Sequence, residues 1–419
     1  MEPIRNFITM FSQSIGVEEP WYIDRAEFSQ QDKAVHIYVR ARETARYACP
    51  ICGEMSERYD NEDKERTWRH GDVVFYPCYV HCRRPRVNCK EHGVHVVTAP
   101  WARPGSRFTL LMESYAMLLM EEMPIAKVAQ VMRSSHSALT RILHYWVGDA
   151  VKRTDLSGVR KLCIDETSHK RGQNYVTLVI DAEQKRVIDV EKGRDASTIE
   201  AFASKLEAKG GACEAIEMVA SDMSGTYMKA KEDWFPQAIS VVDRFHVKKL
   251  MLDAMEVVRR AELGLPKQQR GVIQRKLLMI PSSKCTPAQK RQVEAISKAC
   301  PKTGRAYRMV QALDIIYSCI NPNAAKQRLK ELISWMRRSR LESMMRAALT
   351  LRRYQEEILA YFIQRMTNAL AEGINSIVQA AKRKARGYPT FTGFSCMIYL
   401  VAGRLKLACG SPFSVSLAP

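Results

Sequence analysis

Residues 161–193, KLCIDETSHKRGQNYVTLVIDAEQKRVIDVEKG, contain three short apolar runs separated by polar turns. Their length and their content of Val, Ile and Tyr predict three consecutive β-strands. Downstream, residues 197–210 have the apolar spacing of an amphipathic helix, and IEMVASDM at 216–223 predicts a fourth strand. A further helix follows, and AISVVDRFHV at 238–247 predicts a fifth strand that continues into a helix. This alternation predicts an α/β domain built on one sheet.

Three strands, helix, strand, helix, strand and helix is the element order of an RNase H-like domain. Sheets of this kind bind ligands beyond the carboxyl ends of their strands. Asp165 ends the run KLCID and Asp222 ends IEMVASD, so both carboxylates are expected at strand ends on that edge. A third acidic candidate, Glu372, lies far downstream in the helical segment NALAEGINS.

An acidic trio of this kind is suited to metal-dependent phosphoryl transfer. Hard divalent cations prefer carboxylate oxygens, and a pair of them can stabilise both the attacking and the leaving oxygen. We therefore expect Asp165, Asp222 and Glu372 to be the catalytic residues and to hold Mg²⁺ or Mn²⁺. This hypothesis rests on the three acidic residues together, because each residue alone has an ordinary explanation as a turn or capping residue.

Other acidic residues near the predicted strands have weaker claims. Glu166 is expected on the opposite sheet face from Asp165, because side chains alternate along a strand. Asp181 ends the second strand, where aspartates are common in turns. Asp243 and His246 follow the fifth strand, beside the expected active edge. His246 is therefore a candidate catalytic residue that orients a phosphate or a leaving hydroxyl, with simple packing as the alternative.

The charge composition indicates which class of phosphate compound is the substrate. The 419 residues include 65 Lys and Arg against 45 Asp and Glu, a formal net charge of +20. Such an excess favours nucleic-acid binding through counterion release. The length predicts two to four domains. No apolar run reaches 18 residues and the N-terminus is too polar for a signal peptide, so we expect a cytoplasmic protein without a membrane span.

Twelve cysteines in such a protein are expected to be thiols or metal ligands rather than disulfides. Cys49-Pro-Ile-Cys52-Gly is a zinc-knuckle turn, and Cys89-Lys-Glu-His92 supplies a second half at matching spacing. The ribbon between the halves has strand character, as in a zinc ribbon. We therefore expect Cys49, Cys52, Cys89 and His92 to bind Zn²⁺. The rival ligands are Cys78, His81 and Cys82, whose spacing along a strand suits packing better than chelation.

Two further segments are candidate DNA contacts. Beside the cysteine cluster lie Arg83, Arg84 and Arg86, which could bind phosphates or form a solvated strand face. IAKVAQVM and SHSALTRILHYWV are two helical segments across a short polar turn, as in a helix-turn-helix, with an ordinary helical hairpin as the alternative. The second helix would present a set of polar residues to a DNA groove: Ser135, His136, Ser137, Thr140 and Arg141.

A basic segment follows Glu372 on what is predicted to be the same helix. It contains Lys382, Arg383, Lys384 and Arg386, followed by Gly387-Tyr388. We expect these cations to contact the cleaved strand, the alternative being a solvated helix end favoured by the helix dipole. Between the second aspartate and Glu372, residues 250–366 have helical spacing almost throughout, which predicts an all-helical insertion.

Several of these segments together resemble bacterial insertion-sequence transposases of the ISL-three family. They are CPICG, CIDETSHKRGQNYVTLVID, VASDMSGTY, FPQAISVVDRFHV and AEGINSIVQAAKRKARGYPTFTGF. The resemblance implies a zinc ribbon, a helix-turn-helix and a DDE domain with a helical insertion, with the triad on Asp165, Asp222 and Glu372. The Asp243-x-x-His246 pair is similar to a C/D-x2-H motif of related transposases. The second zinc half departs from the family, which often has cysteines at longer spacing.

The resulting hypothesis is a DNA transposase that acts on the bacterial nucleoid. Its partners would be the terminal inverted repeats and the target, both double-stranded DNA, and holding two ends requires at least a homodimer on DNA. A non-catalytic DNA-binding regulator and a generic nuclease or RNase H are the alternatives. The expected parts are an N-terminal segment 1–45, a zinc ribbon 46–98, a helix-turn-helix 105–152, an RNase H-like core 158–249 and 367–419, and the insertion 250–366.

Overall fold

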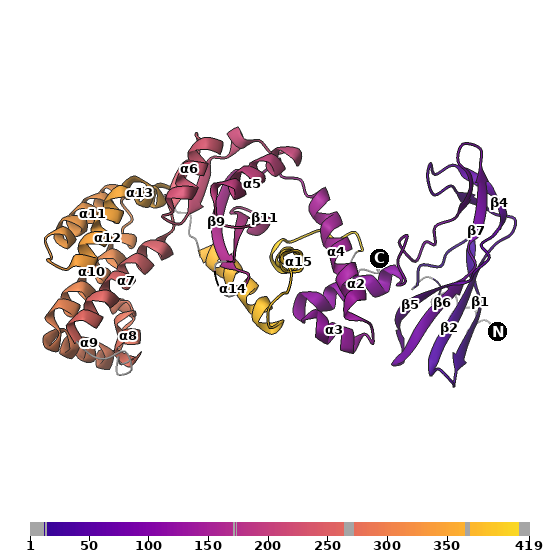
Figure 1. Cartoon of the computed structure of the whole chain (residues 1–419), viewed down its shortest axis with the longest axis horizontal. Coiled ribbons are helices and arrows are strands. Elements are labelled where there is room, and N and C mark those ends of the chain that lie inside the picture. The colour runs from indigo at the N-terminus through magenta and orange to yellow at the C-terminus, as the bar shows by residue number, and fades with distance from the viewer. Residues whose placement is uncertain are drawn as a thin grey trace. The chain divides into compact units, whose positions relative to one another are not determined.

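The computed structural model describes most of the chain. The described residues are 15–170, 174–263, 272–364 and 369–409, together with Ser12 and Gly172. The chain divides into two compact units, Met1–Val151 with Leu405–Pro419 and Lys152–Arg404 (Figure 1). The expected boundary at residues 366 and 367 lies outside the described residues. Among the described helices, none combines the length and the hydropathy needed to cross a membrane.

The first unit contains two four-stranded sheets. One has the order β1-β2-β6-β5 and consists of β1 (Trp21–Ser29), β2 (Ala34–Ala41), β5 (Arg66–Val73) and β6 (Tyr76–Cys82). The other has the order β3-β4-β7-β8 and consists of β3 (Arg46–Ala48), β4 (Met55–Asn61), β7 (Pro85–Cys89) and β8 (Gly93–Val96). The expected hairpin in residues 20–45 is β1 and β2.

The stretch between the zinc halves does not form one ribbon. β6 pairs in parallel with β2, so β5 and β6 extend the N-terminal sheet, while β4 and β7 pair with each other. The cause is the alternation along β6, where Cys78, Val80 and Cys82 are all fully buried against a core that includes Trp68 and Trp101. Burial of these side chains fixes both the partner and the register of the strand.

Three helices follow these sheets: α2 (Leu110–Glu122), α3 (Ile125–Val131) and α4 (His136–Arg153), whose last two residues belong to the second unit. The Glu113 carboxylate on α2 is fully buried, and it accepts hydrogen bonds from Arg103 Nε at 2.8 Å and Trp146 Nε1 at 2.7 Å. Since a buried charge is tolerated only when it is paired and hydrogen-bonded, this contact holds α4 and the segment before α2 in place.

His70 on β5 provides a pH-dependent contribution to stability in this unit. Its Nδ1 lies 2.9 Å from Oγ1 of Thr109, the N-cap of α2, and burial lowers the pKa of His70 from 6.5 to about 4. Between pH 4 and pH 6.5, His70 therefore binds a proton in the unfolded chain but not in the folded chain. This contribution is complete above pH 6.5 and is lost as the pH falls toward 4.

We expect the free energy of unfolding to fall by about 2 kcal/mol more in the wild type than in His70→Gln when the pH falls from about 7.5 to about 5. Urea unfolding of the full-length protein, followed by tryptophan fluorescence at both pH values, measures this difference. His136→Gln, which removes an exposed histidine of the same unit, is the control and should behave as the wild type. Equal pH dependence in His70→Gln and the wild type would contradict the prediction.

The second unit is built on a five-stranded sheet of order β11-β10-β9-β12-β13. Its strands are β9 (Lys161–Ser168), β10 (Tyr175–Asp181), β11 (Arg186–Lys192), β12 (Met218–Ser221) and β13 (Ile239–Val242). β10 is antiparallel to both neighbours, whereas β9, β12 and β13 are parallel. This mixed sheet has the strand order expected of an RNase H-like domain.

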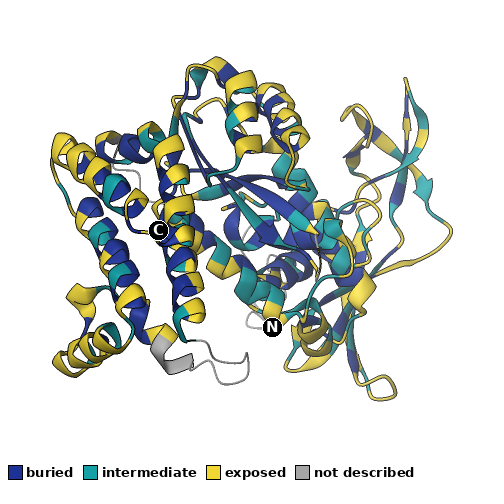
Figure 2. Ribbon diagram, turned by 60° about the vertical axis from the view of Figure 1, so that its left-hand side comes forward, coloured by how far each residue is buried: buried dark blue, intermediate teal, exposed yellow. Residues whose placement is uncertain are grey.

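Helices cover both faces of this sheet. α5 (Ala196–Ala208) and α6 (Gly225–Trp234) pack on one face, through side chains such as Ile199, Phe202 and Tyr227. α14 (Ala369–Lys384) and α15 (Phe391–Ala402) pack on the other, through side chains such as Val378 and Phe394. Figure 2 shows the strands buried between helices whose outer sides are exposed.

The remaining helices form the expected insertion. They are α7 (Arg244–Leu263), α8 (Val272–Leu278), α9 (Pro287–Ala299), α10 (Pro301–Tyr317), α11 (Pro322–Arg337), α12 (Glu342–Arg353) and α13 (Gln355–Gln364). The short helical turns η1 (Cys213–Ala215) and η3 (Ser282–Lys284) lie between longer elements. α7 begins directly after β13 rather than near residue 250, so one continuous helix joins the sheet to the insertion. Its Lys248 binds Asp314 of α10, at 2.7 and 2.8 Å.

Candidate functional site

Parallel pairing brings the acidic residues to one edge of the sheet. Cys163 lies opposite Ala220, and Ser221 lies opposite Val242. Asp165, Asp222 and Asp243 are therefore level on β9, β12 and β13 or directly after them. The expectation that Asp165 ends its strand is wrong, because pairing with β10 extends β9 to Ser168. Asp222 and Asp243 each follow the last residue of a strand, as expected.

A histidine lies among these carboxylates. His246, in the first turn of α7, has its Nε2 3.9 Å from Asp165 Oδ1 and 3.6 Å from Asp243 Oδ2. Asp243 is only 5% exposed, and its Oδ1 accepts a hydrogen bond from the Phe245 backbone. The sequence left packing and catalysis open for His246, and the structure places its ring beside two of the acids. Asp243, which the sequence left as a rival acid with an open role, belongs to the same group.

Burial makes the two candidate ligands reluctant to ionise. Burial raises the pKa of Asp165 to about 6, and the charges of Asp243 and Asp222 raise it further. The Glu166 backbone N–H and His246 have the opposite effect and lower this pKa. Burial also raises the pKa of Asp222. Among the described residues, neither carboxylate has a lysine or arginine within 4.0 Å. A divalent cation would supply the missing positive charge, so the donor set fits Mg²⁺ or Mn²⁺.

Helix α14 lies along β9 through a series of side-chain contacts. Asn375 Nδ2 donates to Asp165 Oδ2, and Gln379 Nε2 donates to Thr167 Oγ1 at 2.6 Å. Lys382 Nζ donates to Ser168 Oγ at 3.1 Å. Sequence reasoning did not select Asn375 as a site residue, although its position three residues after the candidate glutamate was a usable signal.

Glu372 lies one turn before Asn375, in the first turn of α14, and its side chain is exposed. Among the described residues, Asp165, Asp222 and Glu372 do not form a group whose ligand atoms all lie within 4.8 Å of one another. The helix that carries Glu372 therefore contacts Asp165, while the convergence of all three acids on one metal pair stays a prediction.

The basic residues after Glu372 line a pocket of about 740 Å³. It is formed by His169, Lys170, Gln379, Lys382, Arg383, Arg386, Gly387, Tyr388 and Pro389. The Lys382 amine also binds Ser168 on β9, so the pocket continues from the row of contacts that begins at Asp165. Lys384 belongs to the same helix but does not line the pocket. A pocket with this many cations suits DNA phosphates.

A separate candidate metal centre lies in the first unit. One ligand atom from each of Cys49, Cys52, Cys89 and His92 lies within 4.8 Å of the other three, as expected from the sequence. Sγ of Cys89 is 3.7 Å from Sγ of Cys52 and 3.6 Å from Nδ1 of His92. Gly53, at a φ of 80°, allows the tight turn beneath the first pair. Three thiolates and one imidazole form a tetrahedral donor set that fits zinc.

The electrostatics distinguish one of these ligands, Cys89, from the two rival thiols. Backbone N–H groups of His92 and Glu91 lower the pKa of Cys89, which favours the thiolate that zinc requires. Burial instead raises the pKa of both Cys78 and Cys82 to about 12. These two thiols are therefore core side chains, as the sequence favoured.

The other candidate DNA contacts are exposed to different degrees. Arg84 binds Glu62 at 2.9 Å and Arg86 binds Asp60, while Arg83 is exposed. Ser135 directly precedes α4, and the other residues expected in a groove lie on α4 opposite a buried face that includes Leu139 and Ile142. Of these groove residues, Ser135, His136, Ser137 and Arg141 are exposed and Thr140 is half-buried.

Comparison with protein families identifies three consecutive regions. Residues 162–398 match a model described as a transposase of the ISL3 type with a DDE domain. Residues 97–147 match the helix-turn-helix domain of transposase family ISL3, and residues 45–92 match the zinc finger of transposases IS204, IS1001, IS1096 and IS1165.

Curated relatives are similar along nearly the whole chain. The transposase for insertion sequence element IS1557 of Mycobacterium tuberculosis is 26% identical, over 91% of this chain and 92% of the relative. The transposase for insertion sequence element IS1001 of Bordetella parapertussis is 24% identical, over 90% of this chain and 94% of the relative. The matches agree with the order of zinc ribbon, helix-turn-helix and α/β domain in the structure.

Proposed function

The chain belongs to the ISL3 family of transposases, and we propose that it cleaves and joins DNA at the ends of an insertion sequence through Asp165, Asp222 and Glu372. The observation that carries this proposal is the meeting of Asp165 and Asp222 at one edge of a mixed sheet, without a lysine or arginine partner among the described residues. The proposed place of action is the bacterial nucleoid.

These carboxylates and Glu372 would hold two Mg²⁺ or Mn²⁺ ions, which lower the pKa of the attacking hydroxyl and stabilise the leaving oxygen when bound. The protein's own groups position the DNA. Arg383 and Arg386 would hold phosphates of the cleaved strand, and His246 would orient the reacting phosphate. Water attacks first and releases a 3′-hydroxyl, which then attacks the target, so no covalent protein–DNA intermediate is required.

The first unit would recognise the element ends. Zinc would hold the sheet that contains β7, Arg83 just before that strand would contact DNA, and the N-terminal half of α4 would enter the major groove. Cleaving two ends in one assembly requires at least two copies on DNA, so we propose a homodimer or a larger complex. The target DNA is bound by the same assembly.

Arg141 offers the most direct test of the recognition helix. We expect Arg141→Ala to weaken binding to the terminal repeat by about 1–3 kcal/mol while binding to a scrambled duplex changes little. Fluorescence anisotropy with both duplexes measures the change. Lys152→Ala, at the other end of α4, removes an equal charge and serves as the control. Equal losses for repeat and scrambled DNA would show that Arg141 contacts only the backbone.

The proposed activity is tested on a labelled duplex that carries one terminal repeat and its flanking DNA. We expect the full-length protein to release a 3′-hydroxyl at the repeat boundary with Mg²⁺ or Mn²⁺, and to bind without cleavage in EDTA. Binding without cleavage in either metal would indicate a DNA-binding regulator. Cleavage that ignores the repeat would indicate a generic nuclease.

A further inference from the structure

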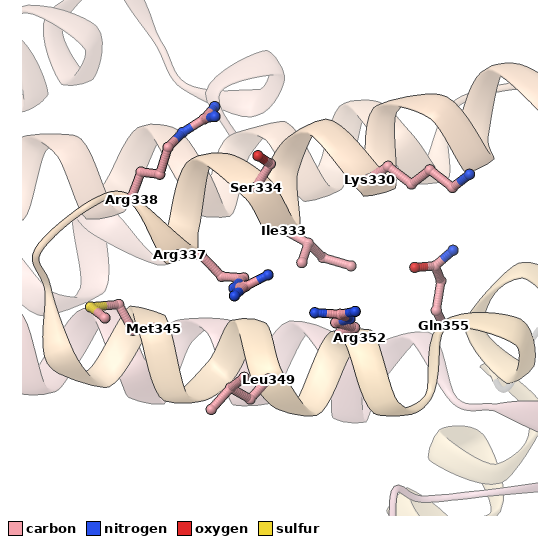
Figure 3. Close-up of a pocket in the computed structure, with 9 residues that line it drawn as sticks. All are labelled: Lys330, Ile333, Ser334, Arg337, Arg338, Met345, Leu349, Arg352 and Gln355. Carbon is pink, nitrogen blue, oxygen red and sulfur yellow. The ribbon is translucent and has the colours of Figure 1, made fainter.

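A groove on the helical insertion lies outside the site described above. It runs between α11 and α12, has a volume of about 680 Å³ and appears in close-up in Figure 3. Its lining residues are Lys330, Ile333, Ser334, Arg337, Arg338, Met345, Leu349, Arg352 and Gln355. Lys330 and Arg337 are seven residues apart on α11, so they lie about 10 Å apart along one face of that helix.

The groove is strongly cationic. Residues 322–353, which contain both helices, have nine Lys and Arg against two Glu, and so carry +7 of the net charge of +20. Among the described residues, no carboxylate lies within 4.0 Å of the four cations of the groove, whereas Arg346, outside it, pairs with Glu342. The side chains of Arg337 and Arg352 point into the space between the helices (Figure 3).

This arrangement is electrostatically unfavourable without a counter-charge. Cations that gather from two facing helices repel one another, and no carboxylate of the described residues forms an ion pair with these four. The cost falls when a polyanion enters, because phosphates neutralise the cations and release condensed counterions.

The apolar part of the groove narrows the choice of polyanion. Ile333 is 5% exposed and forms the floor, while Met345 and Leu349 are exposed on the wall at 40% and 59%. A sugar–phosphate backbone offers apolar deoxyribose between charged phosphates and so matches both features. Ser334 and Gln355 are the uncharged polar side chains of the lining, and the other four polar side chains are cations, which can bind phosphates of any sequence.

We propose that the α11–α12 groove binds the backbone of double-stranded DNA independently of its sequence. The insertion then provides a second DNA contact in the unit that carries the catalytic edge. This inference rests on the proposed action on duplex DNA, but it does not depend on which acids form the triad.

The test compares two double variants of the full-length protein. Arg337→Gln/Arg352→Gln removes two charges inside the groove, and Lys326→Gln/Arg328→Gln removes two exposed charges of α11 outside it. Affinity is measured against salt concentration for two duplexes of unrelated sequence. We expect the groove variant to lower the slope of log K against log salt by about 2 for both duplexes, since each phosphate contact contributes about 0.9. The control should keep the wild-type slope.

Unchanged binding in the groove variant, or equal losses in both variants, would overturn the proposal. So would a lower mass of the DNA-free groove variant than of the wild type in light scattering, because the groove would then be a contact between copies. Circular dichroism verifies that both variants fold, as expected for exposed substitutions. Asp222→Ala, measured in parallel, should bind both duplexes as the wild type does. If Asp222→Ala still cleaves element ends, the proposed triad fails while the groove result stands.

Discussion

Asp222→Ala is expected to reduce strand cleavage at element ends by roughly 10⁴-fold or more, the scale seen when one member of a catalytic group is removed. Asp222 directly follows β12, level with Asp165 on the parallel strand β9. Loss of its oxygens removes ligands from the proposed metal pair, but it leaves the zinc ribbon and the helix-turn-helix unchanged. DNA affinity should therefore stay at the wild-type value. Single-turnover cleavage and anisotropy on the same duplex measure the two quantities.

Glu217→Ala is the matched control, because it removes an exposed carboxylate at the opposite end of β12. It should cleave DNA as the wild type does. Asp165→Asn and Glu372→Gln should show the same separation of binding from cleavage as Asp222→Ala. Wild-type cleavage by Asp222→Ala would exclude this triad.

The second large effect is expected on zinc removal. Structural zinc contributes on the order of 10 kcal/mol to the folding of small zinc domains. Strands β3, β4, β7 and β8 are short, and the ligand turns join them in pairs. We therefore expect Cys52→Ser to reduce bound zinc from one ion per chain to nearly none and to unfold this sheet. Metal analysis and hydrogen exchange across residues 46–96 detect both changes.

Cys319→Ser is the corresponding control, since Cys319 is a half-buried thiol of the insertion. It should keep one zinc per chain and wild-type exchange in residues 46–96. A stoichiometric zinc ion together with wild-type exchange in Cys52→Ser would contradict the assignment of Cys52 as a ligand that this sheet requires.

Features set by local spacing could be predicted from the sequence. The Cys49 and Cys52 pair and the Cys89 and His92 pair each lie within one turn, so the donor set could be predicted before the fold. Strand order in the second unit could likewise be predicted from the alternation of strand and helix periods. The start of the second helix near Ser135 is a local capping signal of the same kind.

Features set by pairing over long distances could not be predicted. β6 pairs with β2 because three of its side chains fit a shared core. Strands β3 and β4, which lie between β2 and β6 in the sequence, belong to the other sheet. Asp165 lies within its strand because β10 extends β9 beyond it. The contact of Asn375 with Asp165 spans 210 residues, and the groove cations converge only once α11 and α12 pack side by side.

The central claim is that Glu372 shares a metal pair with Asp165 and Asp222 on DNA. Iron(II) can replace magnesium at carboxylate sites, where peroxide then generates radicals that cut the chain near the ligands. Applied to the full-length protein on an element end, this measurement should give three groups of cuts, near residues 165, 222 and 372, all suppressed by excess Mg²⁺. Cuts near residues 165 and 222 that spare the segment around residue 372 would contradict the account.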